Sequence, residues 1–179
     1  MKKCYSLINI IGVIMLITSC TKGNDEKSFE NPYGYFTIEE VEGEYVVVPE
    51  TVVDASVFEQ FVHNGGWAQG SPMRVTTEAV DEKPLVGSAC VIWSFEEDGK
   101  TLVFSEPQDP SKPVNYRECT YSLQGNRLFM GNEDMGIICY MDSQKLVRVD
   151  RRNSGGWLLY IHGNVSDEMV DQYRQKCGL

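Results

Sequence analysis

Short apolar runs separated by turn-forming residues recur through the middle of the chain. From Met73 to His162 the runs are rich in β-branched and aromatic residues, a composition typical of half-buried strands. Four turn signals lie between successive runs: Asp98-Gly99, Gln124-Gly125-Asn126, Asp142-Ser143-Gln144-Lys145 and Asn153-Ser154-Gly155-Gly156. We therefore expect tight hairpins joined into an antiparallel up-and-down meander. Such a meander hides its edges by closing into a barrel.

One strand and one short helix are predicted ahead of this meander. Val41 to Val48 is rich in β-branched and aromatic residues, and Pro49 ends the predicted strand. Ser56 and Glu59 have the spacing of a capping box, so we expect the helix to begin there. Its apolar face carries Val57, Phe58, Phe61 and Val62. A helix this short needs packing against the domain to persist.

The last residues of the chain predict a second helix. Ser166 can cap its start, and Gly178 ends it. One apolar face is formed by Met169, Val170, Tyr173 and Cys177. We expect this amphipathic helix to pack outside the sheet or across one mouth of the barrel. The sequence thus predicts a mostly β fold with one short internal helix and one C-terminal helix.

The first 20 residues have the organisation of a secretory signal peptide. Lys2 and Lys3 precede an apolar stretch from Leu7 to Leu16, and small residues precede Cys20. The stretch is shorter than the roughly 20 apolar residues of a membrane-spanning helix. Ile17-Thr18-Ser19-Cys20 resembles the lipobox of bacterial lipoproteins. In that motif the cysteine is lipidated, with palmitate among its acyl chains, and becomes the first residue of the mature chain.

The lipobox resemblance implies a protein anchored in the cell envelope. We expect residues 1–19 to be the signal peptide, residues 20–35 to be the lipidated Cys20 with a flexible tether, and residues 36–179 to be a single β-rich domain. Thr21 after the cysteine implies the outer membrane, and both its periplasmic and its surface face remain open. The first expected partner is therefore the membrane, through the lipid on Cys20.

Charge and cysteine content narrow the classes of partner. The formal net charge is −10, and removal of Lys2 and Lys3 with the signal peptide changes it to −12, since −10 minus 2 is −12. An acidic chain without a basic cluster argues against a nucleic-acid partner. The domain keeps four cysteines that allow three pairings, and one disulfide and none remain equally open: Cys90, Cys119, Cys139 and Cys177.

Several segments resemble the bacterial lipocalin-like domains. Gly43-Glu44-Tyr45 stands where lipocalins often carry Gly-x-Trp in their first strand. The segments Trp93 to Lys100 and Tyr121 to Leu128 are similar to their mid-barrel hairpins, and Leu146-Val147-Arg148-Val149 is similar to a late strand. The resemblance spans the chain from Val41 to His162. It implies an eight-stranded barrel that could hold a small apolar ligand.

Aromatic residues on the predicted strands are the candidate ligand contacts. The set comprises Trp93, Phe95, Phe104, Tyr121 and Trp157, with Tyr116 or Arg117 placed to orient a polar group near a barrel mouth. An eight-stranded barrel is just wide enough to hold one small ligand or to be filled by side chains. The same aromatic residues can therefore be core.

Catalytic and metal-binding patterns are absent from the sequence. It contains no Gly-x-Ser-x-Gly elbow, no phosphate loop and no His-Glu-x-x-His. Glu96-Glu97-Asp98 falls at a predicted hairpin turn and not across a cleft. His63 and His162 lack a second ligand two or four residues on. We expect no enzyme activity, no metal and no cofactor.

The sequence therefore predicts a lipid-anchored, non-catalytic module that binds a small apolar or amphipathic ligand. The alternative is a protein-interaction or scaffold lipoprotein whose β core is filled by side chains. In that alternative, Trp67 in the loop from Gly65 to Gly70 would be an exposed anchor. The interior volume separates the two, because small-molecule pockets commonly measure roughly 300 Å³ or more.

Overall fold

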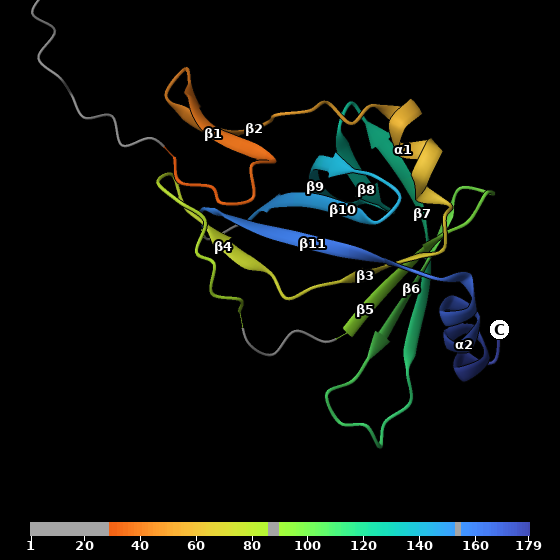
Figure 1. Ribbon diagram of the computed structural model, residues 1–179. Helices are drawn as coiled ribbons and strands as arrows, with labels where there is room; N and C mark the ends of the chain where they lie inside the picture. The colour runs from red at the N-terminus through yellow and green to blue at the C-terminus, as the bar shows by residue number, and fades with distance from the viewer. Residues whose placement is uncertain (1–28, 86–89, 153–154) are drawn as a thin grey trace, which may run out of the picture.

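The computed structural model describes residues 29–85, 90–152 and 155–179 (Figure 1). The predicted signal peptide, Cys20 and the first part of the predicted tether lie outside the described residues. Within the described part the chain is mostly β, with two antiparallel sheets, one internal helix and one C-terminal helix. The predicted fold class is confirmed at this level.

Eight strands form one continuous antiparallel ladder. In chain order they are β3 (Gly66–Gln69), β5 (Cys90–Phe95), β6 (Lys100–Glu106), β7 (Asn115–Gln124), β8 (Arg127–Met130), β9 (Glu133–Met141), β10 (Lys145–Arg151) and β11 (Trp157–Val165). Each strand pairs with the next in this order. Because β11 pairs with both β10 and β3, the ladder returns to its first strand. This order agrees with the predicted up-and-down meander.

A short ninth strand, β4 (Met73–Val75), continues β3 along the same side of β11. Gln69 of β3 pairs with His162, and Met73 of β4 pairs with Leu159 three residues earlier. Between the two strands, the Gly70 N–H donates a hydrogen bond to the Ile161 carbonyl at 2.9 Å. The first half of β11 is thus flanked by β10 on one side and by β4 on the other.

A separate hairpin replaces the single strand that was predicted from Val41 to Val48. β1 (Phe36–Val41) and β2 (Glu44–Pro49) form a two-stranded sheet of their own. The turn residues Glu42 and Gly43 have φ values of 54° and 83°. This is the left-handed region that tight hairpins require and that glycine adopts readily. Gly43 therefore reverses the chain and does not open a strand of the main ladder.

The internal helix, α1 (Ala55–Val62), is capped by Asp54, and the prediction of Ser56 was wrong. One Asp54 carboxylate oxygen accepts hydrogen bonds from the N–H groups of Ser56 at 2.9 Å and Val57 at 3.0 Å. Asp and Ser are similarly good N-caps. The cap is therefore decided by where the extended backbone ends, and Asp54 still has a ψ of 177°.

The C-terminal helix, α2 (Asp167–Cys177), has the predicted caps. Ser166 accepts a hydrogen bond from the Met169 N–H, and Gly178 ends the helix with a φ of 75°. Val170 and Tyr173 are its buried residues, and they pack against three residues of β5 and β6: Ile92, Leu102 and Phe104. These three residues face outward, so α2 lies on the outside of the sheet.

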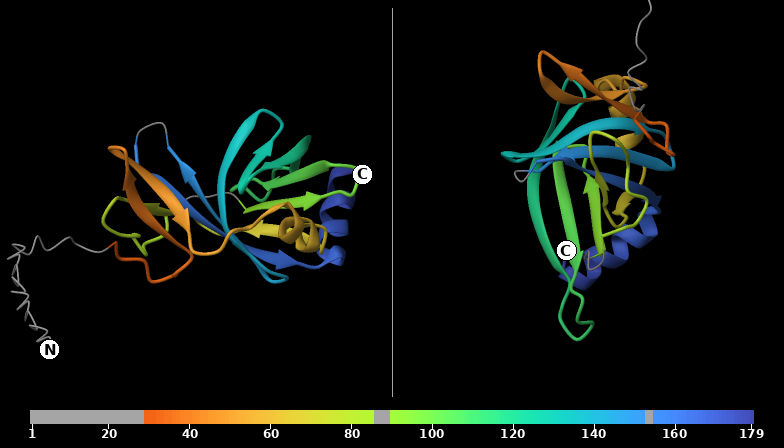
Figure 2. Two further views of the ribbon diagram at one scale, coloured as in Figure 1. Left: turned by 90° about the horizontal axis from the view of Figure 1, so that it is seen from above. Right: turned by 90° about the vertical axis from the view of Figure 1, so that its left-hand side faces the viewer.

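Buried side chains form three clusters, one inside the ladder and two outside it. The inner cluster includes Phe58 and Val62 of α1. One outer cluster lies beneath α2, and the other lies between the β1–β2 hairpin and strands β4, β9, β10 and β11. Seen from above, the β1–β2 hairpin and β4 lie at one end of the molecule, and α2 with the C-terminus lies at the other (Figure 2).

Candidate functional site

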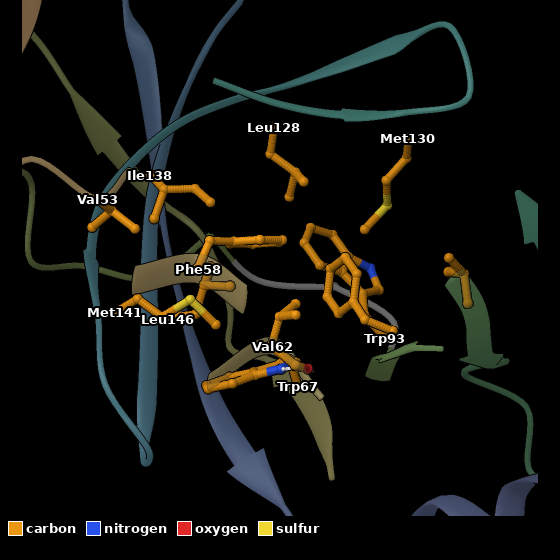
Figure 3. Close-up of a cluster of buried hydrophobic side chains, with 12 residues drawn as sticks. Val53, Phe58, Val62, Trp67, Trp93, Leu128, Met130, Ile138, Met141 and Leu146 are labelled. Atoms are coloured by element: carbon orange, nitrogen blue, oxygen red, sulfur yellow. Dashed lines mark hydrogen bonds between the residues drawn. The ribbon is translucent and has the colours of Figure 1, made fainter. Parts of the chain in front are cut away.

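Half of the predicted ligand contacts lie together inside the ladder. The rings of Phe95 and Tyr121 meet edge to face with centroids 5.1 Å apart, and Trp93 lies 6.2 Å from Phe95. Phe58 of α1 enters this group, 5.8 Å from Phe95 and 6.0 Å from Tyr121. Figure 3 shows Phe58, Val62 and Trp93 directed toward one another. The helix therefore fills this end of the interior with side chains.

The other predicted contacts face outward. Phe104 is fully buried against Tyr173 of α2, with ring centroids 5.8 Å apart. Tyr116 pairs with Phe104 across the ladder and is 46% exposed. Trp157 belongs to the outer cluster beneath the β1–β2 hairpin. Successive strand residues point to opposite faces, so the six predicted residues do not share one lining.

The prediction that Trp67 is an exposed anchor was wrong. Its side chain is fully buried in the inner cluster, and its indole N–H donates a hydrogen bond to the Val62 carbonyl at 3.0 Å. A turn-like sequence rich in glycine suggested an exposed loop. Gly66 and Trp67 instead begin β3, where Trp67 pairs with Trp93 and faces inward with it.

Arg148 is the centre of a buried polar cluster that the sequence did not reveal. It is 2% exposed. Its Nε donates to His162 Nε2 at 3.2 Å, its Nη1 donates to the Met135 carbonyl at 2.6 Å, and its Nη2 donates to Gln69 Oε1 at 3.3 Å. These partners lie on β11, β9 and β3, so one guanidinium group connects strands on both sides of β10.

Burial and the charge of Arg148 set the protonation of His162 in this cluster. The Arg148 guanidinium lies 3.8 Å from the Tyr160 ring centroid and 4.9 Å from that of Trp93. Burial lowers the pKa of Arg148 to about 10. Burial, and then the neighbouring Arg148 charge, hold the pKa of His162 well below its usual range. His162 is therefore neutral, and its Nε2 lone pair accepts the Arg148 hydrogen bond.

The two histidines have different partners. His63 contacts the Phe95 carbonyl at 3.0 Å and Glu59 at 3.2 Å, whereas His162 belongs to the Arg148 cluster. In the part of the chain that the structure describes, no group of three histidine, cysteine or acidic residues is placed to hold a metal ion. The four cysteines are free: Cys90, Cys119, Cys139 and Cys177.

An open cleft of about 710 Å³ lies at the β1–β2 end of the molecule. Its lining comes from the β1–β2 turn, β4 with the residues after it, and the β10–β11 connection: Gly43, Glu44, Tyr45, Arg74, Val75, Thr76, Thr77, Arg151, Arg152, Gly155, Gly156 and Trp157. We call it the arginine cleft. Its volume is in the usual range for small-molecule sites, roughly 300–1,000 Å³.

Three arginines give the arginine cleft its chemistry. Arg74 is exposed between the buried residues of β4, while Arg151 ends β10 and Arg152 follows it. None of the three side chains has a hydrogen bond or ion pair with another described residue. Glu44 is the only carboxylate among the lining residues given above. As far as the described residues go, the side chains of these three arginines have no hydrogen-bond or ion-pair partner and can bind an anion.

The register of the strands places these arginines around Trp157. Arg151 of β10 pairs with Trp157 from one side, and Val75, the neighbour of Arg74 on β4, pairs with it from the other. At Gly156, just before Trp157, a Cβ atom would lie 3.1 Å from the Val75 carbonyl oxygen. The absence of a side chain there lets the start of β11 come close to β4.

A second hollow of about 110 Å³ adjoins the arginine cleft and shares Tyr45, Arg151 and Trp157 with it. The rest of its lining is mostly apolar: Val46, Val47, Arg127, Ile137 and Val149. Arg127 is held by an ion pair with Asp134. We call this space the apolar side hollow. A molecule with a charged and an apolar part could use both spaces.

Sequence reasoning missed the arginine cleft because its parts are far apart in the chain. Arg74 is separated from Arg151 by most of the main ladder, so no basic cluster is visible in the sequence. The paired residues Arg151-Arg152 were the only local signal.

No helix among the described residues is long and apolar enough to span a membrane. The chain matches no protein-family model, no curated protein and no solved structure.

Proposed function

We propose that the protein is a lipid-anchored, non-catalytic binding module that holds a small amphipathic molecule carrying an acidic group. The arginine cleft carries this proposal, because three arginines whose side chains form no ion pair or hydrogen bond with another described residue line one hollow of suitable volume. Arginine pairs strongly with carboxylate and phosphate through its planar fork of donors. The apolar side hollow would receive the apolar part of the ligand.

The proposed architecture is a lipocalin-like barrel whose ligand does not sit in the interior. The closed circuit of strand pairing supports a barrel. Phe58, Val62 and Trp67, all fully buried, supply the reason for placing the ligand elsewhere, since they fill the interior at the α1 end. The filled core also suits the alternative, a scaffold lipoprotein that acts through protein contacts.

The anchor belongs to the proposal as well. Lipidation of Cys20, with palmitate among its acyl chains, would hold the domain at the outer membrane, on its periplasmic or its surface face. The binding role needs no cofactor and no nucleic acid. Substitution Cys20→Ala should move the protein from the membrane fraction to the aqueous fraction. Retention in the membrane without lipid would contradict the anchor.

Native mass spectrometry of the full chain purified from its own host tests the ligand. We expect an extra mass that is lost on denaturation. Arg151→Gln should lower its occupancy about tenfold, because a tenfold change in Kd corresponds to about 1.4 kcal/mol and a charge-assisted hydrogen bond contributes about that much or more. Arg117→Gln is the matched control, since Arg117 is ion-paired with Glu133 and lies outside the cleft.

Two results would overturn this proposed function. A bound mass that Arg151→Gln leaves unchanged would place the ligand elsewhere. A bare mass, obtained reproducibly, would favour the scaffold alternative and direct the search to partner proteins.

A further inference from the structure

Residues of both charge signs line the arginine cleft. Arg74, Arg151 and Arg152 line it together with Glu44, the first residue of β2. In the part of the chain that the structure describes, the Glu44 carboxylate forms no ion pair or hydrogen bond with any of these arginines. The positive and the negative group therefore remain available to a ligand in the same hollow.

We propose that the polar end of the ligand is a zwitterion, in which an anionic phosphodiester meets the arginines and a nearby ammonium group meets Glu44. This inference rests on the proposed binding function and names its ligand class. A plain anion would leave the Glu44 carboxylate facing a like charge, which is unfavourable in a partly closed hollow. A zwitterion satisfies both groups.

The three arginines of the lining suit a phosphate group as the anion. Arg151 stands on β10 and Arg74 on β4, and these strands flank β11 from opposite sides. Guanidinium groups bind phosphate oxygens through short, charge-assisted hydrogen bonds that are frequently bidentate. Arginine is the residue of choice for phosphate recognition.

The acidic hairpin beside the cleft favours an ammonium group in addition to the anion. Glu39, Glu40 and Glu42 are exposed on the β1–β2 hairpin next to Glu44. Together with a net charge of −10, they raise the cost of bringing a purely anionic molecule to this end of the domain. A ligand with no net charge avoids this repulsion and still uses the arginines.

The path of the chain into the domain makes a membrane amphiphile the natural source of this chemistry. The Glu30 N–H donates to the Glu78 carbonyl, and the Val80 N–H donates to the Glu30 carbonyl, beside the Thr76-Thr77 rim of the cleft. Eight residues lie between Cys20 and Phe29, and the nine steps of the chain from one to the other span at most about 32 Å. With the proposed anchor, the cleft would lie near the lipid head groups. The same chemistry also occurs in free glycerophosphoethanolamine.

The test compares two soluble probes on the full chain held in dodecyl maltoside micelles. Glycerophosphoethanolamine is a zwitterionic phosphodiester, and diethyl phosphate is a phosphodiester without the amine. Isothermal titration should show tighter binding of glycerophosphoethanolamine. Glu44→Gln should weaken that probe about tenfold and should strengthen diethyl phosphate, since it removes an attraction in one case and a repulsion in the other. Arg151→Gln should weaken both probes.

Glu42→Gln is the matched control, because it makes the same charge change two residues away and outside the cleft lining. Because Glu42 lies outside the lining, this variant should change the ratio of the two affinities much less than Glu44→Gln does. Equal affinity of the two probes, or a shift of both in one direction in Glu44→Gln, would overturn the zwitterion and leave the binding of acidic groups standing. If neither probe binds, both the proposed binding of an acidic group and the zwitterionic ligand are contradicted.

A last comparison identifies the source of the head group. Amide hydrogen exchange of residues 73–77 is measured on the lipidated chain in phosphatidylethanolamine vesicles and in dodecyl maltoside micelles. Slower exchange in the vesicles, abolished by Arg151→Gln, supports a membrane lipid as the ligand. Exchange that slows only with added glycerophosphoethanolamine overturns the membrane source and retains the zwitterion.

Discussion

The two ends of the molecule differ in whether their basic side chains form ion pairs with other described residues. At the α2 end, long basic side chains are paired: Arg174 with Glu96, and Lys176 with Glu106 at 3.2 Å. At the opposite end, Arg74, Arg151 and Arg152 line an open cleft without ion pairs to the described residues.

Both ends contain buried apolar clusters, but they differ in the side chains that line their spaces. Near α1 the interior contains fully buried Phe58 and Trp67, whereas exposed arginines line a hollow of about 710 Å³ at the cleft end. Burial of apolar groups is the dominant favourable contribution to folding, so we expect the buried rings near α1 to contribute much more to stability than the cleft arginines. The cleft end leaves binding groups unsatisfied. Stability and binding are therefore separable by mutation.

The largest expected effect is at Phe58. Phe58→Ala should lower the free energy of unfolding by about 3–5 kcal/mol, because it removes a fully buried ring and leaves a cavity. Urea denaturation measures the change. Arg151→Gln at the cleft should change stability by no more than about 0.5 kcal/mol, since the side chain is exposed and has no ion pair or hydrogen bond with another described residue. Similar losses in the two variants would remove the distinction between the two ends.

The second prediction concerns pH and the buried His162. Burial and the Arg148 charge hold the folded-state pKa of His162 well below its usual range. In the unfolded chain a histidine has a pKa of about 6.5. Below that pH the unfolded chain therefore binds a proton at His162 that the folded chain does not bind. Stability is therefore present above that pH and is lost as the pH falls below it, by up to about 1.4 kcal/mol per pH unit.

Urea denaturation of the wild type and of His162→Gln between pH 7.5 and pH 5.5 measures this dependence. The variant should be less stable at pH 7.5 and should lose less stability on acidification. An unchanged acid slope in His162→Gln would assign the effect to other groups. Arg151→Gln serves again as the control from the cleft end, and it should keep the wild-type slope.

The smallest expected effect separates the two candidate caps of α1. Asp54→Ala should lower stability by about 1 kcal/mol, because its carboxylate accepts from two backbone N–H groups of the first turn. Ser56→Ala should change stability by less than about 0.5 kcal/mol, since Ser56 lies within the helix and not at its cap. The reverse order would restore the capping box that begins at Ser56.

Features that depend on neighbouring residues could be predicted from the sequence. The turn at Asp142 to Lys145 and the caps at Ser166 and Gly178 are local, so residue type and spacing were enough. The single strand from Val41 to Val48 was predicted wrongly because its local turn signal was overlooked. Glu42-Gly43 is a turn signal of only two residues, and the β-branched run after it concealed the reversal.

The face on which a side chain lies could be predicted only in part. Trp93 and Phe95 were expected to face the interior, and they do, since residues two apart on a strand share a face. Nothing local indicated that Phe104 and Trp157 would face outward, or that Phe58 of α1 would fill the space beside Trp93 and Phe95. Trp67 was misplaced because a glycine-rich segment can be a loop or a strand packed closely by its neighbours.

The sequence by itself determined the local order of this protein: successive antiparallel hairpins, two amphipathic helices and an acidic charge balance. Period, turn chemistry and capping act over a few residues, and they are therefore visible along the chain. Tertiary structure decided the return of the ladder from β11 to β3, the filling of the interior by α1, and the meeting of Arg74 with Arg151 in one cleft. Those contacts join residues far apart in sequence, and only the strand register around Trp157 brings them together.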